Sequence, residues 1–112
     1  MISRRHLLGG LAAMPALSAC ASTHIVHRLA SLIAVTDWAA IRRSGILGLI
    51  HKATEGGDWI DPSYGQRRPQ AEAAGLLWGA YHFGTRQYSG RKQAESFLSV
   101  VRPTPDTVIA LD

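Results

Sequence analysis

The chain has 112 residues, which is too few for a complete (β/α)₈ barrel of roughly 250 residues. Hydrophobic residues make up 46% of it and charged residues 18%, which excludes a disordered chain, and no apolar run reaches the ~18 residues of a membrane span. The net charge of +4 comes mainly from the first 36 residues, which hold three arginines and no acid, so nucleic-acid binding receives little support.

Residues 1–20 are predicted to be an export signal and not part of the fold. Arg4 and Arg5 form a twin-arginine pair, a weakly apolar stretch follows, and residues 17–20 (LSAC) are typical of a lipoprotein box. We therefore expect export to the periplasm or cell envelope, with Cys20 as a lipidation site and its lipid as the only contact with a membrane. The alternative is an ordinary cleavage site between small residues. A single cysteine excludes an internal disulfide.

The first predicted unit of the fold is a short helix, a glycine, an apolar strand and a polar loop. Thr36 or Asp37 can cap the helix, and Gly45 ends it because glycine accepts the left-handed conformation. Residues 46–50 (ILGLI) then predict a strand that is buried on both faces, and residues 53–58 predict a polar loop.

Two further helices and strands are predicted in the rest of the chain. A helix is expected over residues 61–74, with a kink or break at Pro69, followed by a strand over residues 76–83. A third helix is expected to begin near Ser89, and a strand over residues 107–112 follows it. The apolar spacing predicts that the third helix buries one stripe, formed by Ala94, Phe97, Leu98 and Val101.

Helices and strands that alternate in this way predict an α/β fold with a parallel sheet. Gly45 and Gly75 occupy equivalent places in successive units, and their separation is the length of one βα unit. We expect a partial (β/α) barrel of the TIM-like type, made of about the first three to four βα units.

Polar residues gather where each predicted strand ends. The first strand leads into His51 and Lys52, the second includes Tyr81 and His82, and the third ends at Asp112. In a parallel barrel these ends share one rim, where active sites lie. Strand ends also meet solvent in any fold, so the pattern alone is equally compatible with plain solvation.

The order of several motifs resembles glycoside hydrolase family 25, the Chalaropsis-type lysozymes or N-acetylmuramidases. The resemblance covers residues 36–112, which are identified as the N-terminal part of such a catalytic domain, truncated in this chain. Residues 38–45 (WAAIRRSG) fit the segment that precedes the more specific motifs. Those motifs are residues 51–56 (HKATEG), 61–64 (DPSY), 74–83 (AGLLWGAYHF) and 93–98 (QAESFL).

The resemblance implies cleavage of the β-1,4 bond between N-acetylmuramic acid and N-acetylglucosamine in peptidoglycan, without a metal ion or other cofactor. A family strand that ends in Asp-x-Glu carries two acidic residues, and glycoside hydrolysis needs such groups. Residues 110–112 (ALD) match its beginning, so Asp112 is the candidate catalytic residue, and the chain ends two positions before the expected Glu. The residues implied to line the cleft are Lys52, Glu55 and Tyr81, with Trp59, Tyr88 or Phe83 as a flat apolar face for a sugar ring.

The sequence departs from the family pattern near its beginning. The family starts with a strand of the pattern Ile-Asp-x-Ser-His, whereas residues 23–31 (THIVHRLAS) hold no acid, so residues 21–35 are interpreted as a linker or a degraded first strand. A shifted reading frame over codons 27–29 is one hypothesis for the missing acid. His24 and His27 are not interpreted as metal ligands because no third ligand accompanies them.

Two functional hypotheses remain open. The first is an exported muramidase, truncated and inactive as written. The second is a non-catalytic peptidoglycan-binding barrel or the product of a decaying gene. A nucleotide-binding domain is not favoured because no glycine-rich phosphate loop follows any predicted strand. The sequence makes no prediction of the oligomeric state.

Overall fold

The structure, a computed structural model, describes residues 25–29 and 34–112. The predicted export signal, including Cys20, lies outside these residues. In the described part of the chain, no helix is both long enough and apolar enough to cross a membrane.

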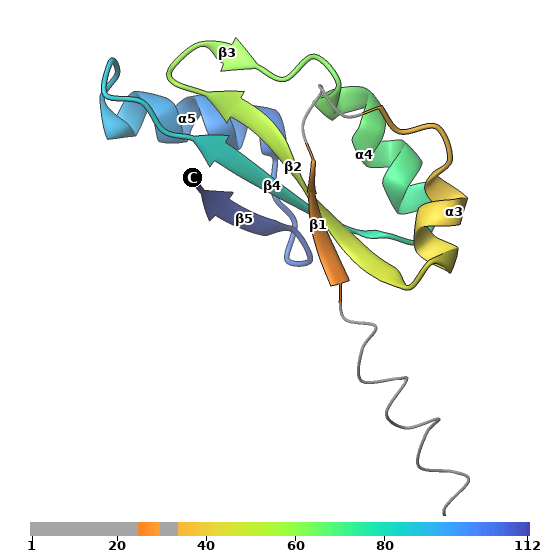
Figure 1. Ribbon diagram of the computed structural model, residues 1–112. Helices are drawn as coiled ribbons and strands as arrows, with labels where there is room; N and C mark the ends of the chain where they lie inside the picture. The colour runs from red at the N-terminus through yellow and green to blue at the C-terminus, as the bar shows by residue number, and fades with distance from the viewer. Residues whose placement is uncertain (1–24, 30–33) are drawn as a thin grey trace, which may run out of the picture.

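The described residues form a mixed α/β fold built on a parallel sheet, as the sequence predicts (Figure 1). Its strands lie in the order β1 (Ile25–Leu29), β2 (Ile46–Glu55), β4 (Leu77–Phe83) and β5 (Val108–Leu111), and each neighbouring pair is parallel. A two-residue strand, β3 (Trp59–Ile60), pairs antiparallel with the end of β2.

Three helices connect the strands: α3 (Trp38–Arg43), α4 (Tyr64–Ala73) and α5 (Gly90–Val101). Asp37 caps α3 by accepting a hydrogen bond from the backbone N–H of Ala40 at 2.9 Å, and Ser89 caps α5 by accepting one from Lys92 at 3.2 Å. Of the two candidate caps of the first helix, Thr36 and Asp37, the structure thus selects Asp37, and the predicted start of the third helix near Ser89 is confirmed. After α3 and α4 the chain turns through Gly45 (φ 97°) and Gly75 (φ 82°), as expected for glycines that end a helix.

Three local predictions are wrong in part. The loop predicted at residue 53 begins only after Glu55, because Thr54 and Glu55 pair with β3 and continue pairing with β4 after a register shift at Ala53. Pro69 does not break α4, which continues through it to Ala73.

The stripe predicted for α5 is also shifted. Gln93, Phe97 and Val101 are the buried residues of this helix, whereas Ala94 is exposed and the Leu98 side chain is 46% exposed. Residues spaced by four lie along one helix face, so this row is the buried one, and Val100 beside it is partly buried against the core.

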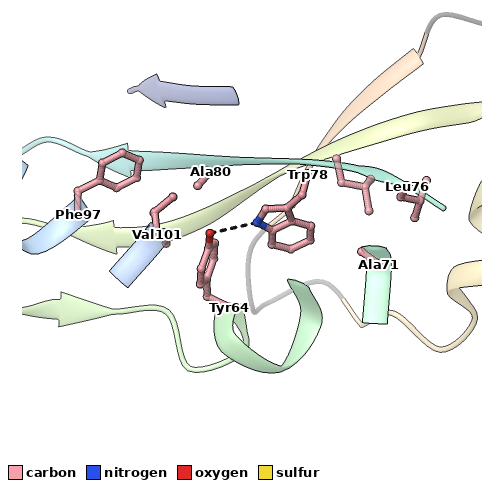
Figure 2. Packing of buried hydrophobic residues seen from close by; sticks show 9 residues of the cluster. Tyr64, Ala71, Leu76, Trp78, Ala80, Phe97 and Val101 are labelled. Atoms are coloured by element: carbon pink, nitrogen blue, oxygen red, sulfur yellow. Dashed lines mark hydrogen bonds between the residues drawn. The ribbon is translucent and has the colours of Figure 1, made fainter. Parts of the chain in front are cut away.

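The hydrophobic core lies between the sheet and the helices (Figure 2). Leu49 from β2 and Trp78 from β4 point into it, and Tyr64, Phe97 and Val101 come from α4 and α5. The indole N–H of Trp78 donates a hydrogen bond to the Tyr64 hydroxyl at 3.1 Å, and the two rings meet edge to face. This bond satisfies a polar group that would otherwise be buried without a partner.

We predict that Tyr64→Phe lowers the free energy of unfolding by about 1–2 kcal/mol, because it leaves the buried Trp78 N–H without its acceptor. Urea unfolding followed by Trp fluorescence measures the effect. Tyr88→Phe is the matched control, since its hydroxyl hydrogen bond to Asp58 lies at the surface, and should change stability less. Equal losses in the two variants would contradict the assignment.

Candidate active site

Side chains alternate in direction along each strand, so the polar residues at the strand ends lie on two opposite faces of the sheet. Lys52 and Tyr81 are register partners on neighbouring strands. The adjoining residues His51 and His82 are buried against the helices, with exposures of 0% and 5%. Because successive side chains of a strand point to opposite faces, only half of the predicted rim can belong to one site.

The face opposite the helices carries the predicted site residues, and we call it the open face. No helix of the described residues covers it, as the ribbon shows (Figure 1). In register across the four parallel strands, its side chains include those of Val26, Arg28, Ile50, Lys52, Glu55, Leu77, Tyr81, Phe83, Val108, Ala110 and Asp112.

Lys52, Glu55 and Trp59 come together at the end of β2. The ammonium Nζ of Lys52 lies 2.5 Å from Oε2 of Glu55 and 4.6 Å from the centre of the Trp59 ring. Trp59 reaches this place because β3 pairs Trp59 with Glu55. The ring of Phe83 lies on the same cation at 5.0 Å. A carboxylate, a cation and two partly exposed aromatic rings thus share one surface.

Tyr81 and Asp112 meet through a residue that the sequence analysis did not select. The guanidinium of Arg28 lies over the Tyr81 ring, 4.3 Å from its centre, and forms an ion pair with the Asp112 carboxylate. These three side chains, with Val26 and Ile50, are among those lining a cavity of about 280 Å³. The sequence allows a degraded first strand here, and the period-two spacing of Val26 and Arg28 is the signal that places Arg28 on the same face as Val26.

Backbone hydrogen bonds fix Asp112 at the end of β5. Its N–H donates to the carbonyl of His82 at 2.9 Å, and its own carbonyl accepts from the N–H of Gly84 at 3.0 Å. These bonds extend the pairing of β4 with β5 beyond Leu111. The carboxylate is therefore held beside Tyr81 by the sheet itself.

A buried network behind the open face holds the loop that follows β4. Nδ1 of His82 lies 2.7 Å from the hydroxyl of Thr54, and Nε2 lies 2.9 Å from the amide oxygen of Gln93. That oxygen also accepts the N–H of Thr85, while the Gln93 amide donates to the carbonyls of Thr85 and Tyr88. Gln93 therefore anchors the loop. A polar residue in the buried row of α5 was the signal for this role.

Tyr88 lies apart from the Lys52 group. Its hydroxyl donates a hydrogen bond to Asp58 at 2.9 Å, and this bond, together with the negative charge, raises the pKa of Tyr88. The ring covers Gly57 so closely that a Cβ there would lie 2.6 Å from Cδ1 of Tyr88. Tyr88 thus packs on the β2–β3 turn, and of the three aromatic candidates only Trp59 and Phe83 lie on Lys52.

His51 supports Lys52 from the helix-covered face. Its Nδ1 donates to the carbonyl of Lys52 at 2.6 Å, which leaves Nε2 to accept from Nη1 of Arg67 at 3.1 Å. The imidazole stacks on Trp78, with the ring centres 5.6 Å apart. Burial lowers the pKa of His51, and the nearby positive charge of Arg67 acts in the same direction, so the ring is neutral at pH 7.

The described part of β1 carries no acid, and its charged residue on the open face is Arg28. His27 lies in this strand, while His24 is outside the described residues. Within residues 25–29 and 34–112, no group of three or more His, Cys, Asp and Glu side chains could hold a metal ion. The open face offers charged groups and partly exposed aromatic rings, which is the chemistry that binds a polar saccharide ring.

Comparison with known proteins finds relatives in a single family of glycosyl hydrolases. Residues 31–112 match the family model described as glycosyl hydrolases family 25. Lysozyme M1 of Streptomyces globisporus is 34% identical over 64 residues, which are 56% of this chain and 22% of that protein. The chain therefore spans about a fifth of this curated relative.

Solved structures resemble the fold as well as the sequence. The bacterial lysozyme from Streptomyces coelicolor has a TM-score of 0.70 and 28% identity, over 76% of this chain and 42% of that one. A family 25 glycosyl hydrolase from Bacillus anthracis has a TM-score of 0.68 and 28% identity, over 73% of this chain and 39% of that one. The described fold thus corresponds to about two fifths of each.

We predict that the free energy of unfolding falls as the pH is lowered below 6.5, because the pKa of His51 is lower in the folded chain than in the unfolded chain. Between the two pKa values the unfolded chain binds more protons, so stability increases with pH in that window and protonation opposes folding. Urea unfolding at several pH values measures this slope.

His51→Gln should reduce the slope, since it removes the buried imidazole. His27→Gln is the matched control at an exposed histidine and should keep the slope of the parent chain. An unchanged slope in the His51 variant would show that other groups cause the pH dependence.

Proposed function

The chain belongs to glycosyl hydrolases family 25, and on this premise we propose that it supplies part of a peptidoglycan hydrolase. The bond cleaved is the β-1,4 bond between N-acetylmuramic acid and N-acetylglucosamine. The single observation that carries the proposal is the position of Asp112, whose carboxylate stands at the end of β5 beside Tyr81 and Arg28 on the open face.

Asp112 is proposed as a catalytic carboxylate of this reaction. In the Asp-x-Glu pattern the glutamate protonates the leaving oxygen, and the aspartate assists the acetamido group of the substrate or the attacking water. Residues separated by two along a strand face the same side, so both acids would point to the open face. The position of the glutamate lies outside these 112 residues.

The remaining site residues are proposed to bind the glycan. Trp59 is 40% exposed and can stack on a sugar ring, and Tyr81 forms part of the cavity wall beside Asp112. Lys52 and Glu55 form a pair whose charges can bond sugar hydroxyls or the acetamido group. Four parallel strands with helices on one face support a further proposal, that this sheet is the beginning of a TIM-like barrel.

Peptidoglycan binding without hydrolysis is the alternative function. It is favoured by one observation, that the described β1 strand presents Arg28 and no acid, so the Asp112 carboxylate is paired with a cation. A paired carboxylate is less available to assist a reaction. The activity measurements below separate the two functions.

We predict that the 112-residue polypeptide by itself releases reducing sugar from purified peptidoglycan at no useful rate. Loss of general acid catalysis alone typically costs about 10²–10⁴-fold. A chimera tests the roles: the chain with Arg28→Asp is joined after Asp112 to the following residues of the Streptomyces coelicolor lysozyme. This chimera should hydrolyse peptidoglycan, and Asp112→Asn should reduce its kcat at least 100-fold.

Asp106→Asn in the same chimera is the matched control, because Asp106 is an exposed acid in the turn before β5. It should leave the rate unchanged. A folded chimera that binds peptidoglycan but does not hydrolyse it would favour the binding function. Turnover by the 112-residue polypeptide comparable to that of the intact lysozyme would show that the catalytic residues lie elsewhere.

The predicted export signal, residues 1–20, supports a proposal on location. The protein is proposed to be exported to the cell envelope and to carry a lipid on Cys20. The prediction is that Cys20→Ala releases the product from the membrane fraction or blocks its maturation, since the lipid is attached through this thiol. Cell fractionation and the mass of the mature product measure this. Ala21→Ser is the matched control, because it leaves the Cys20 thiol in place. Cytoplasmic product with residues 1–20 intact would contradict export.

A further inference from the structure

Among the described residues, the open face carries two cations that differ in exposure, Lys52 and Arg28. Lys52 is closely paired with Glu55, and only 16% of its side chain is exposed. Arg28 is also paired, with Asp112, but 58% of its side chain remains exposed. Arg28 is therefore the more accessible of the two cations to an incoming ligand.

The position of the Arg28 guanidinium is set by two contacts. The ring of Tyr81 lies beneath it, 4.3 Å from the guanidinium carbon to the ring centre. Asp112 engages Nη2 from one side. A guanidinium has five N–H donors, so a single carboxylate oxygen leaves donors for a second partner. The adjoining cavity of about 280 Å³ provides space for one.

We propose that Arg28 binds a carboxylate group of the ligand. Guanidinium and carboxylate match in a two-bond geometry, which makes arginine better suited to this group than lysine. The inference rests on the proposed function and deepens it. In peptidoglycan the carboxylate comes from the lactyl group of N-acetylmuramic acid or from the peptide stem, whereas chitin oligosaccharides carry none.

Asp112 and the ligand carboxylate then compete for the same cation. The two anions repel each other across the guanidinium, so Asp112 weakens carboxylate binding even though it helps to orient Arg28. Removing the Asp112 charge should therefore strengthen binding of a carboxylate ligand relative to binding of a neutral glycan. A purely structural role of the Arg28–Asp112 pair predicts no such difference between ligands.

The test is calorimetric titration of the full chain with three tetrasaccharides. The first alternates N-acetylglucosamine with N-acetylmuramic acid bearing free lactyl carboxylates, the second carries peptide stems, and the third is chitotetraose. Preference of the parent chain for the first or the second over chitotetraose identifies the source of the carboxylate. Arg28→Gln should reduce that preference about tenfold, and Arg28→Lys should reduce it less.

Asp112→Asn should raise the preference for the carboxylate ligand over chitotetraose. Arg91→Gln, at an exposed arginine of α5, is the matched control and should change nothing. An unchanged preference in a folded Arg28→Gln chain would overturn the role of Arg28 while leaving the proposed function intact. Equal affinity of the parent chain for all three ligands would do the same. Failure of the parent chain to bind any of the three would overturn the proposed function as well.

Discussion

The parallel pairing of β2 with β4 is the constraint on which the rest of the site depends. It sets Lys52 beside Tyr81, and the neighbouring pairs with β1 and β5 then bring Arg28 and Asp112 to the same face. Since alternate residues of a strand point to opposite faces, this one register decides which polar side chains face the ligand and which join the core.

The helix-covered face contributes by holding backbone positions. His51 bonds the carbonyl of Lys52, and the pair of His82 and Gln93 holds the loop after β4, so each buried histidine fixes a segment adjoining the open face. Burial keeps His51 neutral, which allows one ring nitrogen to donate and the other to accept. The core and the site are therefore two sides of the same strands.

Charge on the open face is balanced pair by pair. Glu55 neutralises Lys52, and Asp112 neutralises Arg28. The Arg28 side chain is more exposed than the Lys52 side chain. Arg28 also stands in the strand where the family pattern has an acid, so the proposed catalytic carboxylate of Asp112 lies next to a cation. Function at this face then depends on whether Arg28 serves the ligand, Asp112 or both.

The sequence by itself determined the α/β class, the parallel sheet, the helix starts near Asp37 and Ser89, and the family, because these depend on local chemistry and on motif order. Motif order also selected Lys52, Glu55, Tyr81, Trp59 and Asp112, whose roles remain predictions. Tertiary structure alone decided that β2 continues through Glu55, that Gln93 is buried, and that Arg28 pairs with Asp112. The physical reason is that register and ion pairing join residues as far apart as positions 28 and 112, and no local pattern records that contact.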